Sequence, residues 1–393
     1  MDQHRTGLVG DHHDRTVGAG IRIARGKETA MNLTPVQSLA LGVMWVLLFA
    51  VLGGSIVAWS KWIARYRNRV KPDRIANGPQ ATVGFVDILA SVLLLFTLFL
   101  LAPVAWKALG LPVAPTKQES KLNAVPPVEV ESVASADASN PDASSSDVSE
   151  ATTSNVDRGI AVRPAVMTQH QFLVTGFAMS AQLLCVMLMT VFICNGKGCS
   201  LKKLGWRLDQ VAGDLRAGLQ CFLMITPGIL ILNAVLQGLT KTPYEHPIQE
   251  MIKQYPWLLG IAFWQAAIVA PVSEEFAFRV LLIGWFESIQ FGRDKFSALM
   301  FGATPQIQFD TGELPIEYSP PWWPVFLSGT LFGLAHFSYG VSWVALILFG
   351  IVLGRLYQLR QSIIPVIMVH FLFNAMNVTL LGLSIVLPEK IGG

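Results

Sequence analysis

The feature that most constrains the fold of this sequence is a succession of long apolar segments. A helix needs about 20 mainly apolar residues to cross the hydrocarbon core of a bilayer, and about eight segments reach or approach that length. Hydrophobic residues make up 52% of the 393 positions and charged residues only 14%, whereas a soluble domain has about 25% charged residues. We therefore expect an all-α, polytopic integral membrane protein with about eight transmembrane helices. The expected spans are 36–59, 83–106, 171–194, 217–239, 257–279 (its helix continuing to about 291), 323–339, 341–358 and 363–386.

Basic residues gather in three of the connecting loops, which by the positive-inside rule are cytoplasmic. If the chain has eight spans and both termini lie outside the cytoplasm, all three basic loops fall on the cytoplasmic side. This pattern predicts a multi-pass protein of the cytoplasmic (inner) membrane of a prokaryote, in contact with the lipid bilayer. The net charge of +3 is too small to suggest a nucleic-acid partner. The basic residues are Lys61, Arg65, Arg67, Arg69, Lys71 and Arg74 in the first loop, Lys197, Lys202, Lys203 and Arg207 in the second, and Arg355 and Arg360 in the third.

Composition divides the chain into four parts. Residues 1–30 are polar and non-periodic, so we expect them to be disordered, or Met31 to be the true start. Residues 31–112 form a two-helix N-terminal membrane unit. Residues 113–165 are rich in Ser, Ala and Asp and poor in Leu, Ile and aromatic residues, which predicts a disordered, acidic, extracytoplasmic linker. Residues 166–393 contain the remaining six spans and every group with a chemical role. The four cysteines have no spacing typical of a disulfide framework or a thiolate metal site.

Two adjacent acids, Glu274 and Glu275, stand in the fifth span with Arg279 one helical turn further on. A charged side chain at the centre of a bilayer costs about 2.5–3.5 kcal/mol on insertion scales, so these groups are expected to have a joint function. Glu275 and Arg279 are spaced i,i+4 and can form an ion pair, which leaves Glu274 unpaired and facing elsewhere. Pro271 can kink the helix just before the acids. The alternative is that the span ends early and both acids are simply solvated at the membrane boundary.

Two later spans carry isolated polar residues. His336 lies near the end of the sixth span, and His370 and Asn374 share a helix face in the eighth. Taken alone, either histidine could be an ordinary buried residue of the core, and Asn374 could simply link two helices by a hydrogen bond. Because polar groups in hydrocarbon seek each other, we expect the two histidines and Glu274 to converge on one cavity. The sequence has no His-Glu-x-x-His zinc motif and no Gly-x-Ser-x-Gly nucleophile motif.

Small residues recur at four-residue spacing in two neighbouring spans. Gly329 and Gly333 lie in the sixth span, and Gly350 and Gly354 lie in the seventh. Such spacing lets helix backbones approach closely. We expect these two spans to pack tightly against their neighbours.

Taken in order, three motifs resemble those of the CAAX-protease and bacteriocin-processing (CPBP or ABI) family, which includes the type II CAAX prenyl endopeptidases. They are Glu274-Glu275-x-x-x-Arg279, Phe332-x-x-x-His336 and His370-x-x-x-Asn374. The resemblance covers roughly residues 170–386 and implies an intramembrane endopeptidase with a helical-bundle catalytic core. Its substrate would be a membrane-associated peptide or protein.

The resemblance implies a role for each residue. Glu274 would act as the general base for the attacking water, and His336, His370 and Asn374 would position that water and stabilise the oxyanion. Glu275, Arg279 and Phe332 would support the site. Glu274, His336 and His370 could bind zinc, but a glutamate-activated water explains the same residues without a metal, so we expect that no cofactor is required.

The chain departs from the family pattern at Val280, where members commonly have glycine. The two histidines would also lie at different depths if every helix were straight and crossed the whole membrane. Two other functions stay open at this point. One is a non-proteolytic scaffold or immunity-type regulator, and the other is a proton-coupled transporter, for which no inverted repeat is evident.

Overall fold

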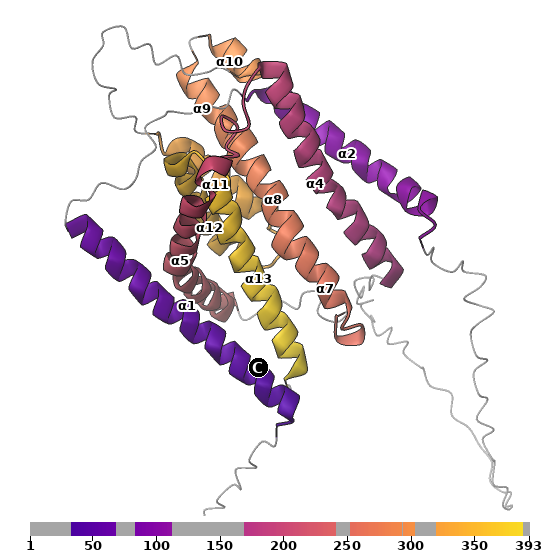
Figure 1. The fold of residues 1–393 in the computed structure, drawn as a ribbon, viewed down its shortest axis with the longest axis vertical. Coiled ribbons are helices and arrows are strands. Elements are labelled where there is room, and N and C mark those ends of the chain that lie inside the picture. The colour runs from indigo at the N-terminus through magenta and orange to yellow at the C-terminus, as the bar shows by residue number, and fades with distance from the viewer. Residues whose placement is uncertain are drawn as a thin grey trace, which may run out of the picture.

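A computed structural model describes residues 33–67, 83–111, 169–240, 252–292, 294–302 and 320–387, and these residues form an all-helical membrane bundle (Figure 1). The long helices are α1 (Pro35–Arg67), α2 (Phe85–Ala108), α4 (Gln169–Lys197), α5 (Val211–Thr240), α12 (Ser342–Arg360) and α13 (Ile364–Val386). Shorter elements are the one-turn η1 (Leu208–Gln210), α10 (Lys295–Phe301) and α11 (Trp323–Ala335). The expected disordered segments, 1–30 and 113–165, lie outside the described residues, and the division of the chain into units stays a prediction.

Six of the described helices are long and apolar enough to cross a membrane. They correspond to the first four and the last two of the expected spans. The fifth expected span is helical throughout, but its geometry changes along its length. The sixth is too short, since α11 has 13 residues and rises about 20 Å, against about 30 Å of hydrocarbon. The polytopic all-α fold is confirmed, while the expectation that 323–339 spans the membrane is wrong because the helix ends at Ala335.

The glutamates lie in a continuous helical run that alternates between α and π geometry. It passes through α7 (Leu258–Phe263), η2 (Trp264–Val269), α8 (Ala270–Glu275), η3 (Phe276–Ile283) and α9 (Gly284–Phe291). Pro271, in the first turn of α8, has no N–H to donate and so fits directly after η2. π-Helical turns are rare and are frequent at functional sites, and here they stand on both sides of the acidic pair.

Helices α11 and α12 form an antiparallel hairpin whose backbones are in close contact. A Cβ atom added at Gly329 would lie 2.7 Å from the backbone nitrogen of Ile351, and one at Gly333 would lie 2.7 Å from the carbonyl oxygen of Trp343. A Cβ at Gly350 would meet the Cα of Gly329 at 3.0 Å. The expected tight packing is therefore confirmed, and it fixes the height of the hairpin tip, residues 336–341.

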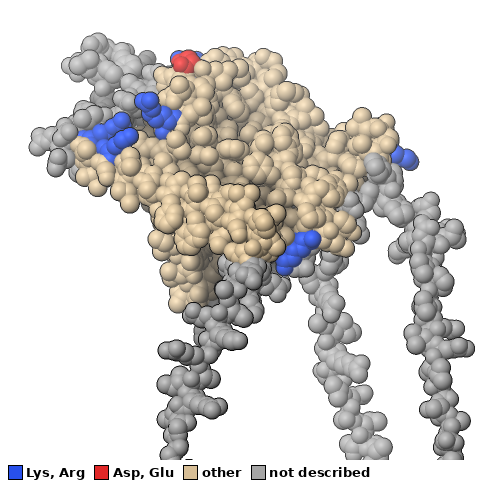
Figure 2. Space-filling view, turned by 60° about the horizontal axis from the view of Figure 1, so that its bottom comes forward, with Lys and Arg blue, Asp and Glu red and all other residues tan. Residues whose placement is uncertain are grey.

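The two N-terminal helices lie on opposite sides of the bundle (Figure 1). Helix α1 packs on α5 and α13, and the indole nitrogen of Trp59 donates to the carbonyl of Met224. Helix α2 packs on α4, where the buried Asp87 binds the ammonium of Lys197 at 2.5 Å. Figure 2 shows a broad uncharged surface with Lys and Arg side chains at its margins, as expected for a bundle surrounded by lipid.

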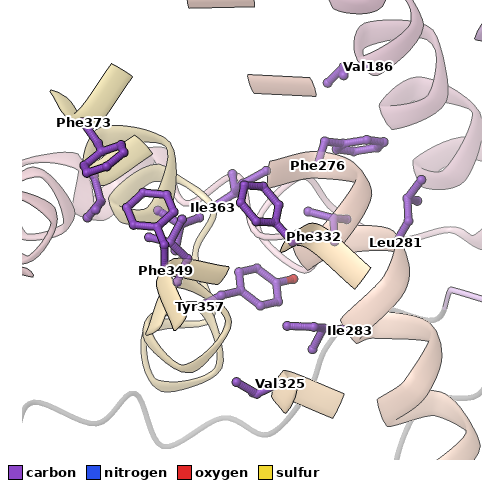
Figure 3. Packing of buried hydrophobic residues seen from close by; sticks show 14 of the residues in the cluster. Val186, Phe276, Leu281, Ile283, Val325, Phe332, Phe349, Tyr357, Ile363 and Phe373 are labelled. Carbon is purple, nitrogen blue, oxygen red and sulfur yellow. The ribbon is translucent and has the colours of Figure 1, made fainter. Parts of the chain in front are cut away.

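The interior is filled by aliphatic and aromatic side chains from α11, α12, α13 and the glutamate-bearing run. Figure 3 shows Phe332, Phe349 and Phe373 among them. The rings of Phe349 and Phe373 lie 4.7 Å apart. This packing provides a rigid support for the polar residues described next.

Candidate active site

A fully buried ion pair lies at the centre of the bundle. Nε of Arg279 is 2.9 Å from Oε2 of Glu275, and neither side chain is exposed. An Nη2 hydrogen bond to the carbonyl of Gly350, 3.4 Å long, ties the guanidinium to α12. The pairing expected from the i,i+4 spacing is confirmed, and the alternative of two acids solvated at the membrane boundary does not hold for Glu275.

Glu274 points instead towards both histidines. Its Oε2 atom is 3.8 Å from Nε2 of His336 and 3.9 Å from Nε2 of His370. Oε2 is buried and has no hydrogen-bonding partner among the described residues, although the side chain as a whole is 28% exposed. The expected convergence of the three groups is therefore confirmed. Both separations are less than twice the length of a hydrogen bond, about 2.8 Å, so one water molecule can touch the carboxylate and an imidazole.

The other ring nitrogens fix how the imidazoles are oriented. Nδ1 of His336 lies 2.8 Å from the carbonyl of Phe332, and Nδ1 of His370 lies 2.7 Å from Oε1 of Glu275. A carbonyl or a carboxylate can only accept a hydrogen bond, so we assign the proton to Nδ1 in both rings. In its neutral form each histidine then presents the lone pair of Nε2 to Glu274.

The two histidines have different supports. His336, the residue after α11, rests on a neutral backbone carbonyl, whereas His370 rests on the buried carboxylate of Glu275. The two rings therefore differ in the charge of the group that holds Nδ1.

Aromatic rings hold these groups in place. The ring of Phe332 lies edge-on to that of His370, with centroids 5.7 Å apart, and 4.9 Å from the ring of His336. The guanidinium carbon of Arg279 lies 5.0 Å from the centroid of the same phenyl ring. Phe349, on α12, contacts His370 from a second side at 5.6 Å. Phe332 therefore touches both histidines and the buried cation, and its expected supporting role stays a prediction.

Asn374 is held differently from the histidines. Its Nδ2 atom donates a 2.7 Å hydrogen bond to the carbonyl of Ala266 in η2. π-Helical geometry changes the hydrogen bonding of the backbone, and a side-chain amide can satisfy a carbonyl there. Asn374 thus connects α13 to the glutamate-bearing run one turn beyond His370, and its expected part in oxyanion stabilisation stays a prediction.

The donor atoms of Glu274, His336 and His370 lie further apart than the ligands of a bound zinc ion. Tetrahedral zinc with bonds of about 2.0–2.1 Å holds its donor atoms about 3.3 Å apart, closer than the separations of 3.8 and 3.9 Å from Glu274 to the histidines. Among the described ranges, no group of three or more His, Cys, Asp or Glu side chains is arranged to hold a metal ion. The geometry fits a shared water better than a preformed zinc site, and a metal requirement is left to experiment.

The contact between Glu275 and His370 was not predicted. Helical spacing relates Glu275 to Arg279, but it contains no information on contacts between separate spans. The short length of α11 also explains the expected mismatch in depth, because His336 stands at a helix end beside Glu274 instead of at the far side of the membrane. Val280, where the family commonly has glycine, is fully buried in the core.

Comparison with known proteins gives one family. The family model for Rce1-like type II CAAX prenyl endopeptidases matches residues 256–376. The matched segment contains all seven residues singled out in the sequence, from Glu274 to Asn374. No curated protein and no solved structure matches the chain.

Proposed function

Because residues 256–376 match the family model for Rce1-like type II CAAX prenyl endopeptidases, we propose that the protein is an intramembrane endopeptidase that uses a glutamate-activated water. The observation that supports this proposal most strongly is the convergence of both Nε2 atoms on Oε2 of Glu274, each within 3.9 Å of that oxygen. A buried carboxylate oxygen without a protein partner beside two imidazole lone pairs is suited to hold and deprotonate one water molecule.

In the proposed reaction, the water is held by Glu274 and His336. Glu274 removes a proton as the water oxygen attacks the carbonyl carbon of the peptide bond, which forms a tetrahedral intermediate. The proton then passes to the leaving amine as the carbon–nitrogen bond breaks. No other reactant is needed, and the products are a new carboxyl terminus and a new amino terminus.

His370 acts on the same water in this proposal, because its Nε2 atom lies 3.9 Å from Oε2 of Glu274. The Glu275 carboxylate, 2.7 Å from Nδ1, holds the ring in one orientation. Arg279 compensates the carboxylate from its other oxygen. Asn374 completes the support by fixing α13 against η2.

The substrate in this proposal is a membrane-associated peptide or protein. The catalytic groups lie within a bundle of apolar helices, so the peptide bond has to reach the site from the membrane or through a path inside the protein. The chemistry described here does not require a prenyl group on the substrate.

The proposal can be tested by comparing the termini of membrane peptides in cells that contain wild-type protein with those in cells that contain Glu274→Gln. The variant keeps the size and hydrogen bonding of the side chain but cannot accept the proton. We expect a set of new termini that depends on wild-type protein and is absent with Glu274→Gln. Asp209→Asn, which changes a half-exposed carboxylate paired with Lys202, is the control and should leave these termini unchanged.

Phenotypic rescue of a deletion strain distinguishes the endopeptidase from the scaffold. If Glu274→Gln rescues fully and no termini differ, the protein acts without proteolysis and the proposal is wrong. A strict requirement for zinc, shown by chelation and metal add-back on purified protein, would overturn the metal-free mechanism and leave the endopeptidase in place.

A further inference from the structure

Two thiols contact each other at the end of α4, apart from the glutamate–histidine site. The Sγ atoms of Cys194 and Cys199 lie 3.8 Å apart, and all four cysteines of the chain are free. Gln182, also on α4, contacts Ser273 next to Glu274, and Cys194 lies about three helical turns further along, or about 18 Å. A disulfide has an S–S length of about 2.05 Å, so a shift of about 1.8 Å would bring the two sulfurs to bonding distance.

The way α4 ends brings the two thiols together. Gly198 has a φ of +60°, the left-handed conformation that terminates many helices and favours glycine. The amide of Cys199 donates back to the carbonyl of Cys194, 3.0 Å away. This is the Schellman motif, in which the side chains at these two positions frequently pack on each other. The spacing of the two cysteines is not that of a Cys-x-x-Cys motif, so the contact depends on this helix end.

The turn that carries the pair is accessible from water. Cys199 is half-buried, while its neighbours Gly198 and Ser200 are exposed. The loop that follows contains Lys202 and Lys203, and the positive-inside rule assigns it to the cytoplasm. Cysteines of that compartment are kept reduced, and a disulfide that forms there is usually transient and redox-sensing. A small oxidant dissolved in water can therefore reach a pair of thiols that starts in the reduced state.

The same turn joins three helices. Its Lys197, between the two cysteines, binds the carboxylate of Asp87 near the start of α2 at 2.5 Å and donates to the carbonyl of Phe301 at the end of α10 at 2.6 Å. The start of α2 also packs on α10, because a Cβ added at Gly84 would collide with the backbone of Gly302. In Figure 1 the ends of α2 and α4 lie beside α10 at the top of the bundle. We call this place the α2–α4–α10 junction.

We propose that Cys194 and Cys199 form a reversible oxidation site, at which a peroxide converts the two thiols into a disulfide that locks the α2–α4–α10 junction. Helix ends fray, and a covalent bond across this one holds the backbone from which Lys197 reaches the other two helices. The site lies outside the segment matched by the family model, and its chemistry is independent of peptide cleavage.

The oxidation takes place in two steps. The thiolate of Cys199, on the exposed turn, attacks one oxygen of hydrogen peroxide, the O–O bond breaks, and a sulfenic acid and one water molecule result after proton transfer. The sulfur of Cys194 then attacks the sulfur of the sulfenic acid and loses its proton, the S–OH bond breaks, and a second water leaves. The two thiols lose two electrons, which reduce the peroxide. Two molecules of reduced glutathione reverse the reaction by thiol–disulfide exchange and become glutathione disulfide.

The first test looks for the bond itself. The full chain in lipid nanodiscs is treated with hydrogen peroxide, remaining thiols are blocked with N-ethylmaleimide, and the peptides are analysed by mass spectrometry. Trypsin cleaves after Lys197, so Cys194 and Cys199 fall on two peptides that only a disulfide keeps together. We expect these linked peptides in the oxidised protein and none that contain Cys185 or Cys221, the controls within the same chain. If peroxide produces no linked peptides, the proposal is wrong.

A second test shows whether the two thiols act as a pair. Dimedone traps sulfenic acids, and in the wild-type protein the sulfur of Cys194 should remove the one on Cys199 before it is trapped. In Cys194→Ser, which is nearly isosteric, dimedone labelling of Cys199 should therefore rise at least about tenfold, because an intramolecular reaction is no longer available. Equal labelling in the two proteins would contradict the pairing. The linked-peptide test uses wild-type protein alone and does not depend on the folding of this variant.

Reversibility distinguishes an oxidation site from a structural disulfide. Excess reduced glutathione should return the linked peptides to two free thiols. A bond that is present before peroxide is added, or that survives glutathione, would be a permanent disulfide and would overturn the proposal.

The effect on the junction is measured by hydrogen exchange of backbone amides, which reports local opening. Oxidation should slow exchange in α10 at least about threefold, while residues 380–386 of α13, at the other end of the bundle (Figure 1), should not change. Cys194→Ser treated in the same way should show no slowing in α10. Equal exchange in oxidised and reduced wild-type protein would refute the lock.

Discussion

Replacement of Arg279 by alanine should destabilise the protein far more than loss of an ordinary ion pair. The guanidinium is fully buried, lies 2.9 Å from Glu275 and bonds to the carbonyl of Gly350. Removing it leaves the Glu275 carboxylate buried with only the ring of His370 as partner. Breaking a buried pair on one side costs about 3–5 kcal/mol, and 3 kcal/mol alone lowers the ratio of folded to unfolded protein roughly 100-fold.

A double-mutant cycle separates this effect from simple loss of packing. The cycle compares Glu275→Gln, Arg279→Met and the double variant by equilibrium unfolding in detergent. Because the double variant leaves no unpaired buried charge, its loss of unfolding free energy should be smaller than the sum of the losses in the two single variants. Lys202→Ala serves as the control, since its pair with Asp209 is about half exposed and should be worth at most about 1 kcal/mol. If Arg279→Ala is no less stable than Lys202→Ala, the buried pair does not stabilise the fold and this reasoning is refuted.

Three other outcomes are expected. Gly333→Ala should destabilise the hairpin by about 1–3 kcal/mol, because its Cβ would press on α12. The control Gly260→Ala should have no such effect, because nothing lies within 4 Å of the added Cβ. Equal unfolding midpoints for the two variants would contradict the close packing of α11 on α12. His370→Gln should reduce the cleavage rate by about 10²–10⁴-fold with little change in thermal stability, and a rate close to wild type would exclude its role. Asn374→Ala should lower both stability and activity because it leaves the Ala266 carbonyl without its amide donor, and a change in activity alone would instead favour direct contact with the substrate.

Much of the local geometry could be predicted because it depends on helical spacing. The pairing of Glu275 with Arg279 follows from four-residue spacing, and the freedom of Glu274 follows from the angle between adjacent residues. The close approach of α11 and α12 follows from the absence of side chains at Gly329 and Gly333. In each case the relevant distance lies within one helix or depends on a residue's size alone.

Contacts between separate spans could not be predicted in this way. The hydrogen bond from His370 to Glu275 depends on the height of α13 relative to α8, and the bond from Asn374 depends on the π-helical turns around Ala266. The length of α11 was also misjudged. Its apolar residues continue past Ala335, so hydropathy extended the expected span to 339, whereas the helix ends where His336 turns towards Glu274.

The central claim is that Glu274 and the two histidines act on one water molecule. Once a cleaved peptide is identified, the most direct test is its single-turnover cleavage by purified Glu274→Gln, His336→Ala and the variant with both changes. Groups that act as a unit give non-additive losses, so the double variant should be only slightly slower than Glu274→Gln alone, which itself should be about 10²–10⁴-fold slower than wild type. If the fold reductions in cleavage rate of the two single variants multiply in the double variant, the claim of a shared catalytic water is contradicted. Cleavage by Glu274→Gln at the wild-type rate would contradict it as well.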